Sequence, residues 1–337
     1  MKFLIAGAGA IGAYVGALMS RAGSDVTLFS RGAHLEAMRK NGVQVKSSAG
    51  NFDSHPKIVG SLEEVGSVDV IFLAVKAHSL VQLAPQLKPL LGPDTTVVSM
   101  QNGLPWWFFQ GFGGQWDGLH LERVDPGGVI SSSIPAGHVL GSIVYFSTEI
   151  VAPGVIQHTE GNRISLGEPD GTRSDRSRNI AEALIASGLR APITTHIRNE
   201  IFVKILGNVA FNPVSTLTRA TLAQMTSDPD ICNIVREIMG ETAAVAGALG
   251  LDLPISIDQR IAGAAKVGEH KTSMLQDFEA DRPLELEAIV GSIVELGERL
   301  DIPMPHTRTV YACTKLLAES MKAPGVPHVS PPLRNMG

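Results

Sequence analysis

The chain has 337 residues, of which 44% are hydrophobic and 18% charged, and its formal net charge is −5. This length favours two domains, and a slightly acidic balance argues against a nucleic-acid partner. The two cysteines, Cys232 and Cys313, have no metal-type spacing and do not make a disulfide framework. We therefore expect a cytoplasmic protein with small-molecule partners and no metal.

The N-terminal stretch MKFLIAGAGAIGAYVGALMSRAG combines one lysine with an apolar run, as a signal peptide does. Its glycine spacing has a better explanation as a nucleotide-binding turn. Later in the chain we find no run of about 20 apolar residues that would span a bilayer. A membrane partner is therefore not expected.

A βαβ pattern opens the chain. KFLIA (2–6) predicts a strand, GAGAIG follows it, a helix continues to about Arg21, and DVTLF (25–29) predicts a second strand. The GxGxxG spacing in this frame is typical of a dinucleotide-binding turn, although an ordinary glycine-rich turn is the alternative. The cofactor-binding candidates are Gly7, Ala8, Gly9, Ala10, Ile11 and Gly12.

The end of the second strand carries Ser30 and Arg31. An acidic residue there would hold the ribose of NAD, whereas a hydroxyl and a guanidinium suit the 2′-phosphate of NADP. The sequence therefore favours NADP over NAD, with a solvated loop charge as the alternative for Arg31.

Two later segments, DVIFLAVKAH (69–78) and TTVVSMQNG (95–103), predict buried strands that end in polar residues. Lys76 and the pair Gln101–Asn102 would project from the carboxyl ends of these strands, where open α/β sheets bind ligands. Alternatively, Lys76 is a surface lysine and Asn102 a turn residue before Gly103.

The second half of the chain is predominantly helical. Strand-like segments near 139–149, 154–159 and 163–167 and the strand-like PITT (192–195) precede it. One helix should begin after the N-cap Asp228, with Pro229 in its first turn, and end before Gly250. Another should begin near Pro283. We expect a Rossmann-type domain at 1–195, a helical domain at 196–320 and a Pro-rich tail at 321–337.

The segment FVKILGNVAFNPV (202–214) places Lys204, Asn208 and Asn212 on one face of an apolar helix. Burying such groups is unfavourable without partners, so the pattern indicates a wet cleft or a ligand. Two simpler interpretations remain: Lys204 extends to solvent, and Asn212 before Pro213 ends its helix.

The segment KTSMLQDFEADRPLELEAI (271–289) is polar around Ser273 and Glu285. Ser273 and Gln276 have capping-box spacing, and Glu285 would lie in the first turn after Pro283, where a carboxylate favours the helix dipole. From spacing alone, these structural roles are the favoured interpretation.

Together, GAGAIG, Ser30–Arg31, LAVKAH, QNG, KILGNVAFNPV and TSMLQDFEADRPLELEAI resemble the ketopantoate reductase family over residues 1 to 320. The resemblance implies a Rossmann domain, a helical domain and NADPH-dependent reduction of 2-dehydropantoate. It implies that Lys204 is catalytic with Glu285 as its acidic partner, and that the substrate contacts Asn102, Asn208, Asn212 and Ser273. Asn102 would also lie near the nicotinamide, and Lys76 and Arg31 would bind the cofactor.

Two features depart from the family pattern. His270 stands where many relatives have Asn, and LPWWFFQGFGGQWDGLHLERVDPGG (104–128) replaces a short helical stretch and holds Trp106, Trp107 and Trp116. This aromatic segment could form a lid or reshape the substrate pocket; a packed loop or subunit contact is the alternative.

These observations predict an NADPH-dependent 2-oxo acid reductase, most simply a 2-dehydropantoate 2-reductase of pantothenate and coenzyme A biosynthesis. One alternative is a reductase of another bulky 2-oxo acid, and a second is an NADPH-sensing protein without turnover. A homodimer is a fair expectation, because helices of such second domains often pair.

Overall fold

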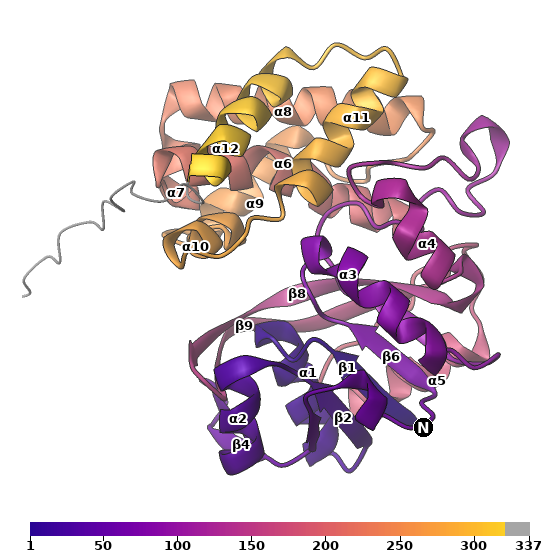
Figure 1. Cartoon of the computed structure of the whole chain (residues 1–337). Coiled ribbons are helices and arrows are strands. Elements are labelled where there is room, and N and C mark those ends of the chain that lie inside the picture. The colour runs from indigo at the N-terminus through magenta and orange to yellow at the C-terminus, as the bar shows by residue number, and fades with distance from the viewer. Residues whose placement is uncertain (321–337) are drawn as a thin grey trace, which may run out of the picture.

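The computed structural model describes residues 1–320; the predicted Pro-rich tail, 321–337, lies outside this range. A nine-stranded sheet with helices on its faces forms one part, and a bundle of helices packs beside it (Figure 1). The strands are β1 (Lys2–Ala6), β2 (Asp25–Phe29), β3 (Val43–Lys46), β4 (Phe52–Ser54), β5 (Lys57–Val59), β6 (Val70–Leu73), β7 (Thr96–Ser99), β8 (Val139–Ala152) and β9 (Val155–Gly167).

The strand order is β4-β3-β9-β8-β7-β6-β1-β2-β5. Strands β5, β2, β1, β6, β7 and β8 run parallel, while β8 and β9 form a long antiparallel hairpin. The carboxyl ends of β1, β2, β6 and β7 therefore meet at one edge, where open α/β sheets bind ligands. The predicted Rossmann-type domain followed by a helical domain is confirmed.

Alternate residues of β1 enter two different cores, as strand geometry requires. Phe3 and Ile5 pack in one hydrophobic cluster with residues of α1, whereas Leu4 and Ala6 belong to a second cluster that continues into the helical part. The helices of the first part are α1 (Ala10–Arg21), α2 (Gly32–Asn41), α3 (Ala77–Leu87), α4 (Val129–Ser133) and α5 (Asp175–Ala186).

Several predicted strands have different bounds. Strand β6 ends at Leu73 and β7 at Ser99, so the polar residues after them lie in loops. The segments 154–159 and 163–167 form the single strand β9. The strand-like segment PITT pairs with β9 only through an isolated parallel bridge between Leu166 and Ile193, and Pro192 has no N–H with which to extend a ladder.

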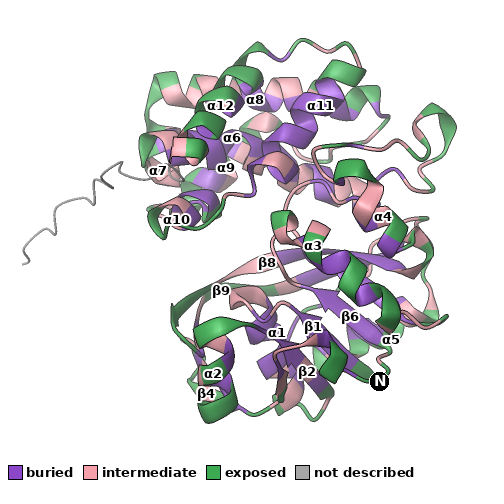
Figure 2. Ribbon diagram, viewed as in Figure 1, coloured by how far each residue is buried: buried purple, intermediate pink, exposed green. Residues whose placement is uncertain are grey.

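The helical part is built around α6 (Ile197–Thr218), which contacts α8, α10 and α12 and is mostly buried (Figure 2). Around it lie α7 (Leu222–Ser227), α8 (Pro229–Ala248), α9 (Ile257–Val267), α10 (Ser273–Glu279), a π-helical turn (Glu287–Gly291), α11 (Ser292–Arg299) and α12 (Pro305–Ser320). Within residues 1–320, no helix has both the length and the apolar character needed to cross a membrane.

Two of the predicted helix starts need correction. The Asp228 cap is confirmed, because its carboxylate accepts from the backbone N–H groups of Asp230 and Ile231. At α10, however, the N-cap is Thr272 and not Ser273: the Thr272 hydroxyl accepts from the Leu275 N–H. The helix expected near Pro283 begins only about three residues later, with a π-helical turn, so Glu285 precedes it.

The aromatic segment after β7 packs into the core that joins the two parts. Trp107, Phe108 and Phe109 are fully buried, and the Trp107 indole Nε1 donates to Ser99 Oγ at 2.8 Å. Phe108 lies against Phe202 of α6, with ring centroids 5.6 Å apart. From Trp107 to Phe109 the segment is therefore packed into the core, as the packed-loop alternative expected; an additional effect on the substrate pocket stays a prediction.

Candidate active site

The glycine turn between β1 and α1 has the geometry of an anion site. Gly7 has φ +107°, and a side chain there would meet the Val75 backbone nitrogen at 2.8 Å. A side chain at Gly12 would collide with the Gly7 carbonyl, whereas Gly9 faces open space. No side chain caps α1 and no acidic residue occupies its first turn. Its N-terminal N–H groups are therefore available to a phosphate.

Ser30 and Arg31 follow β2 on the same edge of the sheet. Ser30 is buried, while Arg31 is exposed at the N-cap of α2, and its guanidinium lies 5.2 Å from the centroid of the Phe29 ring. The guanidinium is thus held beside the glycine turn but remains accessible to a ligand.

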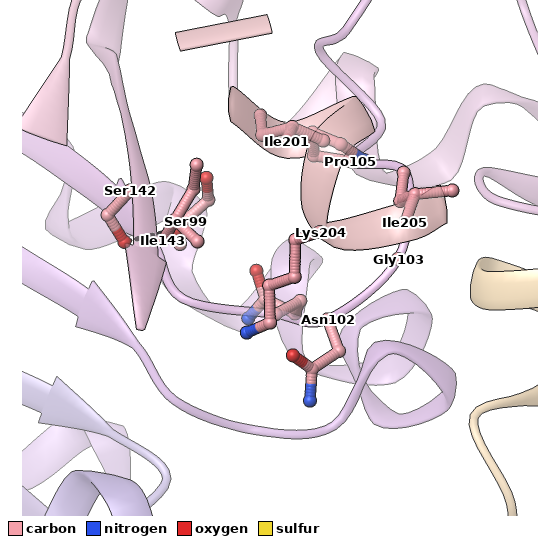
Figure 3. A pocket seen from close by; sticks show the side chains of 10 residues that line it. Ser99, Asn102, Gly103, Pro105, Ser142, Ile143, Ile201, Lys204 and Ile205 are labelled. Atoms are coloured by element: carbon pink, nitrogen blue, oxygen red, sulfur yellow. Dashed lines mark hydrogen bonds between the residues drawn. The ribbon is translucent and has the colours of Figure 1, made fainter. Parts of the chain in front are cut away.

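Lys204 reaches from α6 towards the loop that carries Asn102 (Figure 3). Its Nζ donates to the Val144 carbonyl of β8 at 2.8 Å and lies 5.8 Å from the centroid of the Tyr145 ring. Burial lowers the pKa of Lys204 to about 8, although the charge of Glu285 opposes this shift and that of Arg260 adds to it. The ammonium can therefore lose its proton near neutral pH, and the interpretation that Lys204 extends to solvent is wrong.

Glu285 is buried where the two parts meet. Its Oε1 accepts from the Ala77 N–H at the start of α3, at 3.0 Å. Burial raises its pKa, while the Ala77 hydrogen bond, the charge of Lys76 and a hydrogen bond from Asn102 lower it. No salt bridge joins Glu285 to Lys204, whose ammonium donates to the Val144 carbonyl. The two residues interact through their charges.

The loop carrying Asn102 is fixed against the π-helical turn. Gly103 has φ +85°, and a side chain there would lie 2.5 Å from the Ala288 carbonyl carbon. The Leu104 N–H donates to the Ala288 carbonyl at 2.9 Å. This contact joins the loop after β7 to the segment after Glu285, and the Asn102 side chain hydrogen-bonds to Glu285.

A small cavity of about 20 Å³ lies between this loop and α6. Such a volume is enough for about one water molecule and too small for a substrate. Gln101 lies on its wall, and its Oε1 is buried without a hydrogen-bond partner. Its lining consists of Ser99, Gln101, Asn102, Gly103, Pro105, Ser142, Ile143, Ile201, Lys204 and Ile205.

Asn208 and Asn212 continue the polar face of α6. Asn208 is half-buried, whereas Asn212 is buried and its Nδ2 has no hydrogen-bond partner. An unpaired buried donor indicates a ligand or an ordered water. The suggestion that Asn212 ends its helix is wrong, because α6 continues through Pro213 to Thr218.

Lys76 is at the N-cap of α3, and its ammonium forms an ion pair with Asp277 of α10. Arg282 also contacts Asp277, with Nε to Oδ1 at 3.0 Å. This ion pair links the sheet part to α10, and the cofactor contact of Lys76 stays a prediction. Sequence reasoning did not single out Asp277, although it lies within the family-like TSMLQD stretch.

Ser273 is the first residue of α10 and is exposed. Before it, the backbone carbonyl of His270 accepts from the Leu222 N–H at 3.0 Å, so this segment is tied to α7. The structure places Ser273 on the helix that carries Asp277. Its substrate contact stays a prediction.

Arg260 of α9 is a further cation that the sequence did not single out. Its charge acts on both Lys204 and Tyr145. Arg260 lies in an ordinary amphipathic helix, where an arginine is usually a solvated surface residue. The signal that would have identified it is Gly207, a glycine inside the helix that carries Lys204.

Comparisons with known proteins agree with this arrangement. The family described as "Ketopantoate reductase PanE/ApbA" matches residues 3–106, and "Ketopantoate reductase PanE/ApbA C terminal" matches residues 196–318. The chain is 47% identical to a 2-dehydropantoate 2-reductase of Mesorhizobium japonicum over 94% of its own length and 98% of the relative.

Solved structures give the same result. A protein of Ralstonia solanacearum MolK2, provisionally assigned as a ketopantoate reductase, has a TM-score of 0.90 at 37% identity, covering 95% of this chain and 98% of that chain. The 2-dehydropantoate 2-reductase of Methylococcus capsulatus has a TM-score of 0.81 at 30% identity, covering 96% and 98%. The chain belongs to the ketopantoate reductase family.

Proposed function

We propose that the protein reduces 2-dehydropantoate to pantoate with NADPH, in pantothenate and coenzyme A biosynthesis. The observation that carries this proposal is the desolvated ammonium of Lys204, which lies beside the Asn102 loop where the sheet and the helices meet. The relatives that share the fold are named for the same reaction.

The reaction needs a hydride donor, which the nicotinamide cofactor supplies when bound. Negative charge then develops on the C2 oxygen of the substrate. The Lys204 ammonium would stabilise this charge and donate a proton from Nζ to the oxygen. Asn208 and Asn212 on the same face of α6, together with Asn102 and Ser273, would orient the substrate.

Glu285 acts on this step through its charge. Buried beside the Asn102 loop, the carboxylate favours the protonated form of Lys204 and so opposes the effect of burial. Its hydrogen bond to the Ala77 N–H fixes its position relative to the sheet. Glu285 would therefore keep the general acid charged, and a substrate hydroxyl would share the carboxylate with Ala77 and Asn102.

The residues of the first part fit an NADP cofactor. The uncapped N-terminus of α1 would accept the pyrophosphate, and the turn at Gly7 and Gly12 leaves room for its backbone approach. The exposed guanidinium of Arg31 would pair with the 2′-phosphate, beside Ser30. Lys76 would add a positive charge near the cofactor.

Changing Arg31 to glutamate should reverse cofactor preference. A carboxylate at this position repels a 2′-phosphate and can accept from a ribose hydroxyl, so the ratio of kcat/KM for NADPH to that for NADH should fall by at least about 100-fold. Steady-state kinetics with both cofactors measures this ratio. Arg21→Glu on α1 is the control; an unchanged ratio in Arg31→Glu would refute the assignment.

The activity should decline in alkaline solution. Lys204 acts in its protonated form, and its pKa is about 8. As pH rises through this value the ammonium loses its proton, so kcat/KM should fall about tenfold per pH unit above it. A pH profile from 6 to 10 measures the decline. In Lys204→Arg, whose side chain stays charged, the residual activity should not show this alkaline decline. The same decline in both proteins would exclude deprotonation of Lys204 as its cause.

The function itself is tested by following NADPH oxidation with 2-dehydropantoate, a panel of bulkier 2-oxo acids, and NADH as a control. We expect 2-dehydropantoate to give the highest kcat/KM. Preference for a bulkier acid would support the alternative substrate class. Tight NADPH binding without turnover of any acid would instead support a sensing role and contradict the proposal.

A further inference from the structure

The side chain of Arg260, in α9, packs against α6, the helix that carries Lys204. A side chain at Gly207 of α6 would meet the Arg260 guanidinium, with Nε only 2.5 Å from the position of a Cβ atom. Glycine is otherwise unfavourable inside a helix, by roughly 0.5–1 kcal/mol relative to alanine. The absence of a side chain at 207 therefore makes the space that the guanidinium occupies.

In the described part of the chain, the Arg260 guanidinium has an unpaired Nε and no salt-bridge partner. Its Nε is buried without a hydrogen bond, and within residues 1–320 no carboxylate forms an ion pair with Arg260. Burial lowers its pKa, and only the neighbouring Tyr145 opposes this effect. Arg260 is half-buried, and a partly desolvated cation without an anion is unfavourable, so its position here points to a ligand that supplies the negative charge.

Other cations around this site already have partners. Arg163 lies over the Tyr145 ring, with Cζ 3.9 Å from its centroid. Lys76 and Arg282 both contact the carboxylate of Asp277. Lys204 donates to Val144 and is assigned to the carbonyl of the substrate. Arg260 is thus the neighbouring guanidinium whose hydrogen-bonding groups are left for a ligand.

The position of Arg260 suits a group attached to the reacting carbon. Gly207 follows Lys204 by three residues and Asn208 follows it by four, so the two flank Lys204 on opposite sides of the helical face. In a 2-oxo acid the carboxylate is bonded directly to the C2 carbonyl carbon. A residue that binds the carboxylate must therefore lie beside the residue that binds the carbonyl oxygen.

We propose that Arg260 binds the carboxylate of the 2-oxo acid substrate, with Gly207 providing the space for its guanidinium. This inference rests on the proposed function and adds a substrate-binding residue from α9 to it. A guanidinium presents parallel N–H donors that match the two oxygens of a carboxylate. With the carboxylate on Arg260 and the carbonyl on Lys204, the remaining chain of the substrate extends towards Asn208 and Asn212.

The first test compares an acid with its uncharged analogue. Arg260→Gln should raise KM for 2-dehydropantoate by about 10- to 100-fold, the loss expected for a buried charge-assisted hydrogen bond. KM for the corresponding carboxamide should change less than about threefold, as should the Kd for NADPH. Equal changes for acid and carboxamide, or no change for either, would overturn the proposal.

A second variant acts on the same guanidinium from the other helix. Gly207→Ala should displace the flexible Arg260 side chain and raise KM for the acid in the same direction. In the Arg260→Gln background, the alanine should have a much smaller effect, because the guanidinium is already absent. Full additivity of the two changes would show that Gly207 does not act through Arg260. Arg236→Gln, which removes an exposed arginine paired with Asp258, is the matched control.

Binding measurements test the carboxylate site at Arg260 independently of the proposed reductase activity. If the wild-type protein shows no turnover, calorimetric titration can replace the kinetics. 2-Dehydropantoate is titrated into the NADP⁺-saturated wild type and into Arg260→Gln, and the two Kd values are compared. Weaker binding to Arg260→Gln than to the wild type would support the carboxylate site while the reductase proposal fails. Equal binding, or no binding to the wild type, would overturn the carboxylate site as well.

Discussion

Replacing Lys204 with alanine is expected to lower kcat by roughly three orders of magnitude while leaving the Kd for NADPH almost unchanged. General acid catalysis typically contributes about 10²- to 10⁴-fold, and a buried cation at a developing oxyanion contributes on a similar scale. Alanine removes both contributions. The cofactor candidates lie in the glycine turn before α1 and at Arg31 before α2, whereas Lys204 belongs to α6, so binding of NADPH should survive.

Single-turnover kinetics with 2-dehydropantoate and fluorescence titration of NADPH measure the two effects separately. Lys266→Ala, an exposed lysine of α9, is the control for loss of a positive charge. The structure predicts that Lys204→Ala folds normally, because the variant no longer buries an ammonium. A kcat within tenfold of the wild type would remove Lys204 from the chemical step.

Replacing Trp107 with alanine should lower the free energy of unfolding by about 3–5 kcal/mol. The indole is fully buried and packs against Gly141, where a Cβ atom would lie 2.7 Å from its ring. Alanine would leave a large cavity and would deprive the Ser99 hydroxyl of its Trp107 donor. Such a loss is a large part of the roughly 5–15 kcal/mol that stabilises a typical protein.

Urea unfolding measures this loss, with Trp116→Ala as the matched control. Trp116 is only partly buried near the tip of the same segment, so its replacement should cost much less. If Trp107 shaped the substrate pocket as a lid does, its replacement would change substrate preference and hardly affect stability. That result would contradict the structural role assigned to it.

Local sequence signals predicted the first βαβ unit well. Strands β1 and β2 begin and end where KFLIA and DVTLF do, and α1 ends at Arg21 as expected. Buried strands and glycine turns are determined by neighbouring residues, so they can be read from short segments. The same holds for Asp228, whose side chain caps α8 as its position before Pro229 predicted.

The candidate active site was harder to predict, because it is formed by contacts between segments that are distant in the sequence. The spacing of Lys204, Asn208 and Asn212 predicted a shared face, but it could not show that the Lys204 ammonium reaches β8. The capping-box spacing of Ser273 suggested the wrong cap, because Thr272, one residue earlier, caps the helix by accepting from the Leu275 N–H. The proposed role of Arg260 could not be predicted from its own helix, because it depends on contact with Gly207, which is distant in the sequence and adjacent in space.

The second hydrophobic cluster runs without interruption from Leu4 in the sheet, through Trp107, to Val209 and Ile293 in the helices. The helical part therefore completes its core with side chains that belong to the first half of the chain. Separated from the sheet, residues 196–320 would expose this apolar surface to water. We therefore expect the two parts to unfold as one cooperative unit, so that the site around Lys204 forms only when nearly the whole chain has folded.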